Sequence, residues 1–311
     1  MKKNVLTTLM LLVALMAQAQ NSVTIKPTLK TGMAKAYTIK SESTVPGSMA
    51  ADVTGDLSYK VTDKTADGYQ IDMLSSFSNI DANQLFLKIS SADILQLMNN
   101  MKVELLTDKM GKVNGIKNTK QLIDKNMAMY DSLFHATLDQ NPMLKDNPMV
   151  KESMEKSSKM MKSMLTEDFL MESFIQTPNI LSLNGKTITD GMVEDGTFAQ
   201  ILTTKSTYSL QNGGKTIVQT IKGDMDAASM KKYLAKTLST MLPESVAKEA
   251  NPEELNTMIE TMVSNGSMKM DMNIKATFDL GDDGWVEKLV TEMDMNMPGQ
   301  AMKMRQVMTR K

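Results

Sequence analysis

The chain has 311 residues, with 35 Lys and Arg against 36 Asp and Glu, so its formal net charge is -1 at pH 7. A near-neutral chain without clustered basic residues lacks the electrostatic footprint of a nucleic-acid-binding protein. Cysteine is absent and histidine occurs once, which excludes disulfides, thiolate chemistry and zinc sites of the usual kind. Methionine is abundant, with 33 residues, and we expect it to take over packing that Leu and Phe usually provide.

The N-terminus has the features of an export signal. Lysines follow the initiating methionine, residues 5–16 form a short apolar run, and Ala17-Gln18-Ala19 is a small-residue cleavage site. We therefore expect residues 1–19 to be a signal peptide and residues 20–311 to form one exported domain, periplasmic or secreted. The apolar run is too short to span a bilayer, and no cysteine follows it, so we expect neither a transmembrane segment nor a lipoprotein anchor.

Alternating apolar and polar residues predict long strands in the first part of the chain. The alternation from Met49 to Val61 is typical of a strand with one dry face, and Gly55 interrupts that face as a bulge or bend would. A return strand is expected from Tyr69. A short helix over residues 92–101 and a hairpin over residues 103–116 follow.

The middle of the chain has helical spacing, and strands return after it. Asn-Pro pairs at 141–142 and 147–148 interrupt the helical pattern. We expect helices over 120–138 and from about 149 to 175. The elements expected after them are strands over 180–188, 198–210 and 216–222, a hairpin turn at 211–214, and helices over 227–241 and 253–263.

Methionines alternate with polar residues in the last part of the chain. From Met268 to Leu280 every even position is apolar and every odd position is polar, which predicts a strand with one buried face. Turns at 281–284 and 298–301 would continue this face over three strands. The expected cross-strand pairs are Met272 with Met293, Met270 with Met295, Met268 with Met297, Met297 with Met302, and Met295 with Met304.

These patterns together predict an α+β fold. Long antiparallel strands twist and curl, so we expect one large curved, half-barrel-like antiparallel β-sheet with helices packed on its concave side. A helical insertion at about 119–177 would separate an N-terminal sheet half (35–118) from a C-terminal half (179–311).

Three interpretations compete for the methionine face. It is a plain core covered by the helices of 149–175 and 227–263, or it lines a pocket for a lipid, an acyl chain or another apolar ligand, because methionine repacks around varied shapes at low cost. The third interpretation is Cu(I) binding by thioethers. The candidate ligand-binding residues are Met268, Met270, Met272, Met293, Met295, Met297, Met302 and Met304.

The sequence offers little for catalysis. His135 is the single histidine, on a predicted helix and away from any nucleophile motif. No phosphate-binding or dinucleotide-binding glycine motif stands between a strand and a helix. The acidic stretches 63–67 and 279–283 lack the spacing of a calcium loop and are explained by turn chemistry. We therefore expect a protein without enzymatic activity and without a cofactor, whose alternative role is structural or interactive within the cell envelope.

The chain resembles a group of uncharacterised exported Bacteroidetes proteins. The likeness covers most of the exported part and rests on the signal ending Ala17-Gln18-Ala19-Gln20, the Lys-Thr-Gly-x-x-x-x-Tyr segment from Lys30 to Tyr37, and the late methionine-rich meander. In architecture the predicted fold is also similar to the lipoprotein-carrier (Lol-type) half-barrel, whose concave face holds acyl chains. Architecture alone does not confer function, and neither resemblance assigns site residues.

Overall fold

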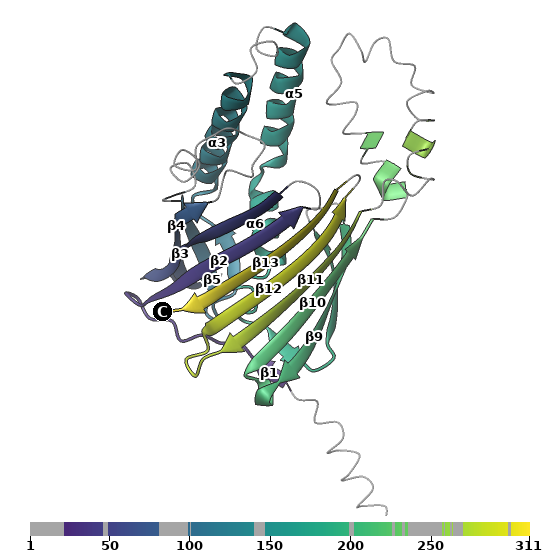
Figure 1. Ribbon diagram of the computed structural model, residues 1–311. Coiled ribbons are helices and arrows are strands. Elements are labelled where there is room, and N and C mark those ends of the chain that lie inside the picture. Colours follow the sequence, from purple (N-terminus) through teal and green to yellow (C-terminus); the bar gives the residue numbers. More distant parts are fainter. Residues whose placement is uncertain are drawn as a thin grey trace, which may run out of the picture.

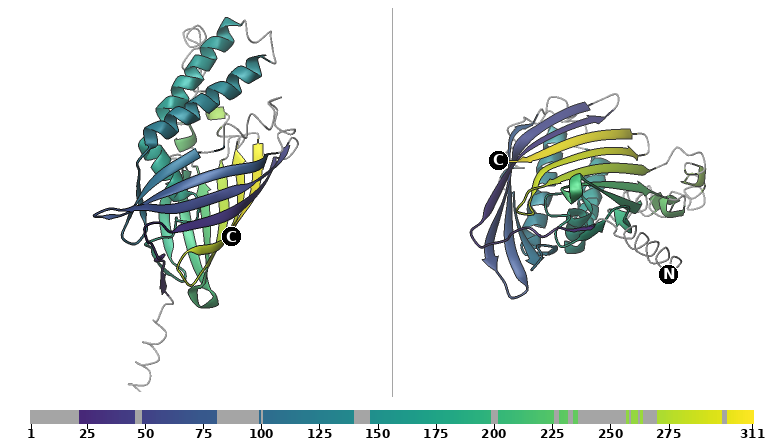
Figure 2. Two further views of the ribbon diagram at one scale, coloured as in Figure 1. Left: turned by 90° about the vertical axis from the view of Figure 1, so that its left-hand side faces the viewer. Right: turned by 90° about the horizontal axis from the view of Figure 1, so that it is seen from below.

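The protein is mostly β, with one large open antiparallel sheet (Figure 1). The computed structural model describes residues 22–45, 49–80, 99, 101–139, 147–198, 202–225, 228–231, 234–235, 257, 259–261, 263, 270–297 and 300–311. Eleven strands follow one another across the sheet in the order β6-β5-β4-β3-β2-β13-β12-β11-β10-β9-β8, and β1 and β7 form a separate two-stranded sheet. The prediction of a large curved antiparallel sheet is confirmed (Figure 2).

The elements have the following bounds. The strands are β1 (Ser22–Thr24), β2 (Ala34–Val45), β3 (Met49–Lys64), β4 (Gly68–Ile80), β5 (Met101–Asp108), β6 (Val113–Ile116), β7 (Thr187–Thr189), β8 (Val193–Phe198), β9 (Leu202–Gln211), β10 (Thr216–Asp224), β11 (Asp271–Leu280), β12 (Val286–Met297) and β13 (Gln300–Arg310). The helices are α3 (Thr119–Asp139), α5 (Pro148–Met164) and α6 (Glu167–Gln176), with a short 3-10 turn at Asn212–Gly214.

The first and last parts of the chain meet at the centre of the sheet. β13 pairs with β2 in antiparallel register, which places Met308 opposite Ile39. Apolar residues in both strands face the same side, so this pairing buries Tyr37, Ile39 and Met308 in one core. The pairing makes a single continuous sheet of strands that lie more than two hundred residues apart in the chain.

The expected packing of the helices on the concave side is not confirmed. α3 and α5 contact each other and extend beyond the end of the sheet (Figures 1 and 2). The single helix expected from about 149 to 175 is broken, because Thr166 caps a new helix by accepting a hydrogen bond from the backbone N–H of Phe169 at 3.1 Å. That helix, α6, contacts both β6 and β8. It therefore bridges the two edge strands of the open sheet.

Two irregular segments fill one end of the concave side. Ile25, Leu181 and Ile188 are almost completely buried in the same core as the strands. The strand expected over 180–188 is wrong for most of its length, since residues 180–185 form successive turns before β7. Asn179 explains this: its side-chain oxygen accepts a hydrogen bond from the backbone N–H of Leu181 at 2.9 Å, and this local bond competes with strand pairing.

Trp285 closes the core at the turn between β11 and β12. We expected this turn at 281–284; it lies there but is one residue longer, since Leu280 pairs with Val286. The indole is only 1 % exposed, and its N–H donates to the carbonyl of Thr28 at 2.9 Å. Its ring also packs against Tyr59 at a centroid distance of 6.3 Å. The β11–β12 hairpin is thereby fastened to the N-terminal segment.

The remaining expectations have mixed outcomes. The bulge at Gly55 is confirmed by a register shift between β3 and β4, and the turn at 211–214 is confirmed by left-handed backbone at Asn212, Gly213 and Gly214. β8 was not predicted. Most of the helix expected over 92–101 lies outside the described residues. Within it, Asn99 is described as a turn and Met101 as the first residue of β5. Most of the helices expected between 227 and 263 also lie outside the described residues.

Candidate functional site: a methionine surface on the sheet

Six methionines gather on the concave face toward one end of β11, β12 and β13. Met272 and Met293 are 2 % and 8 % exposed, beside the buried Leu202, Ile221 and Ile274. The others are partly exposed and pack around them. We call this set the Met cluster: Met270, Met272, Met293, Met295, Met302 and Met304.

The Met cluster is separate from the main core. The main core contains Phe278, Leu289 and Met308 of the same three strands, together with the buried segments around Ile25 and Leu181. The Met cluster continues the same face of the strands beyond that core. One face of the sheet is thus filled at one end and carries partly exposed methionine at the other.

The expected register of these strands is wrong, although the expected face is right. Met272 lies opposite Met295 rather than Met293, and Met295 lies opposite Met302 rather than Met304. A register irregularity between Asp279 and Leu280 shifts the first hairpin. In the second, β12 ends at Met297 and β13 begins at Gln300, which tightens the turn. Both shifts amount to two residues, and an even shift keeps side chains on their face.

Two of the eight candidate residues cannot be assigned to the cluster. Met268 lies outside the described residues. Met297 belongs to the backbone of β12, where it is opposite Gln300, but its side chain lies outside the described part. Four residues of the cluster's surroundings were not foreseen: Phe198, Leu202, Ile221 and Met225. The strands of Leu202 and Ile221, β9 and β10, were predicted, but no local signal indicated that β10 pairs with β11 across the intervening segment.

A mostly polar row of side chains borders the Met cluster on the side of the main core, to which its apolar member Ala276 belongs. Cross-strand register aligns Gln219, Ala276, Thr291, Gln306 and Ser41 across neighbouring strands. Thr291 is 2 % exposed, and its hydroxyl has no hydrogen-bond partner among the residues that the structure describes. A buried hydroxyl without a partner costs free energy, so this position is a donor and acceptor that a bound molecule could satisfy.

A charged side chain of the described strands, Glu194, lies on this face near the edge of the sheet. Glu194 of β8 accepts hydrogen bonds from the Tyr208 hydroxyl at 2.6 Å and from the Lys186 ammonium at 2.9 Å. Partial burial raises the pKa of Glu194, but these two bonds outweigh it and lower the pKa overall. Burial, followed by the bond to Glu194, raises the pKa of Tyr208. The group is a structural link between β8, β9 and the segment before β7.

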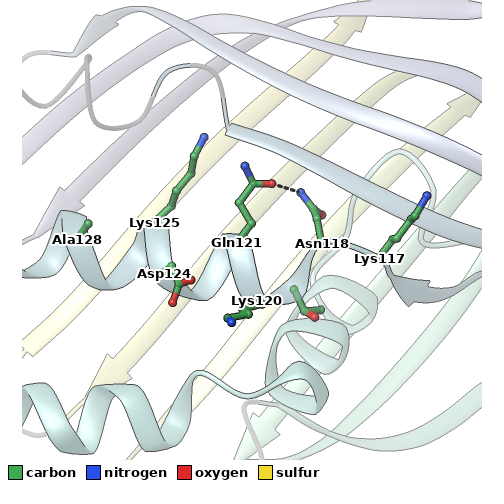
Figure 3. Close-up of a pocket in the computed structure, with 8 residues that line it drawn as sticks. Lys117, Asn118, Lys120, Gln121, Asp124, Lys125 and Ala128 are labelled. Atoms are coloured by element: carbon green, nitrogen blue, oxygen red, sulfur yellow. Dashed lines mark hydrogen bonds between the residues drawn. The ribbon is translucent and has the colours of Figure 1, made fainter.

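A separate hollow of about 610 Å³ lies along the first turns of α3 (Figure 3). Figure 3 shows Lys117, Gln121 and Lys125 pointing to the same side of this hollow. Asn118, also in its lining, has a structural role, since its side chain accepts from the backbone N–H of Glu104 and donates to the carbonyl of Lys102. The lining is charged and polar, unlike an apolar ligand site, and we assign it no ligand.

Metal and histidine sites are not assembled in the described part of the chain. No group of three or more His, Cys, Asp or Glu side chains lies close enough there to hold a metal ion. His135 is exposed on α3, with Nδ1 2.7 Å from the carbonyl oxygen of Asp131 one turn earlier. Among the described residues, no helix combines the length and the apolar character needed to cross a membrane.

Comparison with known proteins identifies no family. No family model matches the sequence, and no curated protein matches it either. The chain is similar at 9 % identity to a structure of lipovitellin that concerns lipid-protein interactions, with a TM-score of 0.40 over 91 % of this chain and 25 % of that one. A porin-like protein from Bacteroides uniformis ATCC 8492 has 9 % identity and a TM-score of 0.20, over 91 % of this chain and 97 % of its own. The chain thus spans a quarter of the lipovitellin chain, and both TM-scores are too low to support a conclusion on function.

Proposed function

We propose that this protein is an exported, non-catalytic protein of the periplasm or cell exterior that binds an apolar ligand, such as a lipid or acyl chain, on the Met cluster. Partly exposed Met270, Met295, Met302 and Met304 surrounding a buried centre are the observation that carries this proposal. Contiguous apolar surface outside the main core is typical of a binding surface. Methionine side chains are flexible and polarizable, and they adapt to ligands of different shape.

Export and the absence of catalysis are supported by the sequence. The N-terminal signal and its cleavage site support a location outside the cytoplasm. The single histidine and the lack of cysteine leave few of the groups on which nucleophilic and metal-assisted reactions depend.

A structural role is the second candidate, and one observation favours it. Met272 and Met293 are nearly as buried as the residues of the main core. If the whole Met cluster served only for packing, the protein would act through its other surfaces as an interaction protein of the envelope. The two candidate functions predict different effects on ligand binding when the exposed methionines are substituted.

Two cross-strand pairs on the same strands allow a matched test. Met295 and Met302 are partners on the concave face of β12 and β13, and Val290 and Val307 are partners on the opposite face. Replacing Met295 and Met302 together by Gln keeps side-chain length but makes the surface polar. The double replacement of Val290 and Val307 by Gln makes the same chemical change on the other face. Binding of the uncharged dye N-phenylnaphthylamine is measured for both variants, beside native mass spectrometry of wild-type protein from its own host.

The proposed function predicts that the two variants differ in dye binding but not in folding. The methionine variant should keep its fold, judged by circular dichroism, and lose dye binding by about tenfold, while the valine variant retains it. A co-purifying mass in the lipid range would identify the ligand class. Wild-type protein that binds no dye and carries no lipid would favour the structural role, as would equal dye binding by the two variants.

A further inference from the structure

The concave face around the Met cluster, much of it buried, carries no charge on the described part of its central strands. Register places three rows of residues across β9, β10, β11, β12 and β13 on the concave face, and two of the rows continue onto β2. Every described member of these rows is neutral at pH 7, and we call them the uncharged rows. They are Thr204, Gly223, Met272, Met295 and Met302; Ser206, Ile221, Ile274, Met293, Met304 and Ser43; and Tyr208, Gln219, Ala276, Thr291, Gln306 and Ser41. At the β8 edge, Glu194 lies beyond Ser206 and pairs with Lys186, whose ammonium also donates to the Tyr208 hydroxyl at 3.3 Å.

The opposite face of the same strands is highly charged. The register pairs Glu292 with Arg305 and Asp294 with Lys303 lie next to the methionine pairs of β12 and β13. Their charged groups approach to 3.8 Å and 3.6 Å. The chain thus places ionised side chains at adjacent positions but keeps them off the uncharged rows. This contrast indicates which ligands can bind, because a surface that binds a fatty acid anion needs a cation close to the carboxylate.

An ionised ligand would be strongly disfavoured on the uncharged rows. Taking a carboxylate out of water costs several kcal/mol unless a cation or several hydrogen-bond donors replace the lost hydration. The described residues of these rows offer hydroxyl and amide groups but no Lys, Arg or His. An ester, hydroxyl or amide group is satisfied by such partners at much lower cost.

We infer that the ligand of the Met cluster is a free uncharged lipid, in which a long acyl chain is joined to its polar group through an ester. This inference rests on the proposed function and deepens it by naming the ligand class. The acyl chain lies on the methionines, and the ester lies toward Thr291 and Gln306. The unpartnered hydroxyl of Thr291, in the row that borders the Met cluster, supplies a hydrogen-bond donor for the ester carbonyl.

The deciding experiment compares two probes with the same chain. Monodecanoylglycerol and decanoate are titrated into the purified protein with bound N-phenylnaphthylamine at about pH 8, well above the pKa of a carboxylic acid of roughly 4. We expect the wild type to bind the neutral ester at least about tenfold more tightly than the anion. Both probes are used below their micelle concentrations.

A designed cation tests the cause of this selectivity. Gln306→Lys places an ammonium group beside Met304 and Thr291, while Val290→Lys places one on the opposite face of β12 as a control. We expect Gln306→Lys to raise the affinity for decanoate about tenfold, and Val290→Lys to leave it unchanged. Thermal unfolding of both variants shows whether they fold. If Gln306→Lys does not fold, the wild-type comparison decides by itself.

The outcomes separate this inference from the proposed function. Preference for the ester, reduced by Gln306→Lys, supports an uncharged ligand. Equal or tighter binding of decanoate by the wild type overturns the inference but leaves the apolar site in place. Tighter binding of an acylated lipopeptide than of monodecanoylglycerol overturns the assignment to a free lipid. Failure of the dye and of every acyl probe to bind overturns the proposed function and the inference with it.

Discussion

Arg310 donates hydrogen bonds to both carboxylate oxygens of Asp283, at 2.9 Å and 3.1 Å. Asp283 also accepts from the Lys35 ammonium at 2.7 Å, and Arg310 reaches Glu287 at 2.6 Å. The carboxylate therefore connects β2, β13 and the turn between β11 and β12. It lies next to Trp285, so this ion cluster and the indole hold together the first and last segments of the sheet.

Asp283→Asn should destabilise the protein at neutral pH. The change removes the negative charge between two cations, which stay partly buried at 22 % and 21 % side-chain exposure. We expect a loss of about 1–2 kcal/mol in the free energy of unfolding. Urea unfolding followed by Trp285 fluorescence measures it. Asp282→Asn is the control, since Asp282 is 92 % exposed and pairs with an exposed lysine; an equal effect of both substitutions would contradict the assigned role.

The same carboxylate predicts a pH dependence. Partial burial raises the pKa of Asp283, but hydrogen bonds from Lys35, Arg310 and the backbone of Trp285 outweigh this and lower it to about 2. A folded pKa below the unfolded value of about 3.9 stabilises the folded state above the unfolded pKa, and the contribution is lost as pH falls toward 2. The stability difference between wild type and Asp283→Asn should therefore shrink between about pH 4 and pH 2. A difference that is constant over this range would show that charge is not the cause.

The irregular N-terminal segment should contribute strongly to stability. Ile25 is 1 % exposed in the main core, and its backbone bonds to Lys186 and Gly185. Ile25→Ala leaves a cavity and should cost about 2–4 kcal/mol in the free energy of unfolding. Thr24→Ala, at an exposed neighbouring position, should cost well under 1 kcal/mol. Urea denaturation of both variants checks this, and a small effect of Ile25→Ala would mean that the segment is not part of the cooperative core.

The strands were predictable because their signal is local. The alternation from Met49 to Val61 and from Met270 to Leu280 indicates that one face of each strand is buried, and this does not depend on which strand pairs with it. The pairing of β13 with β2 has no such signal, since it depends on contacts between distant segments. The break at Thr166 was visible only as a capping residue inside a continuous apolar pattern. Turns replace the strand predicted over 180–188 because the Asn179 side chain bonds to the local backbone. Hydrophobicity alone does not indicate this competition.

The candidate site was predicted in part for the same reasons. The face of Met272, Met293 and Met304 follows from alternation alone and survives a register error of two residues. The degree of exposure does not follow from alternation, because it depends on what packs on the face. One of the three interpretations placed the methionines beneath the helices of 149–175 and 227–263. In the described part of the chain, α6 bridges the sheet edges and α5 packs along α3, and Met295, Met302 and Met304 are partly exposed.

Oxidation should follow the exposure gradient within the Met cluster. A two-electron oxidant such as hydrogen peroxide converts a thioether to a polar sulfoxide, and exposed sulfur reacts first. Met295 and Met302 are partly exposed, whereas Met272 is 2 % exposed. We expect the first two to oxidise several-fold faster, measured by peptide mapping and mass spectrometry. A bound apolar ligand should slow their oxidation but not that of Met110, which is partly exposed at the distant turn before β6. Equal rates for Met272 and Met302 would contradict the described packing.

Thr291→Val should separate stability from ligand binding. Valine has nearly the shape of threonine, so the substitution removes a buried hydroxyl that has no partner among the described residues while the packing is retained. The free energy of unfolding should rise by up to about 1 kcal/mol without ligand. Affinity for monodecanoylglycerol should fall about fivefold, because the ester carbonyl loses a donor. Ser41→Ala in the same row is the control, with a smaller effect on both quantities, measured by urea unfolding and dye displacement. A variant that is destabilised, or that binds the ester as tightly as wild type, would show that the Thr291 hydroxyl serves the fold and not the ligand.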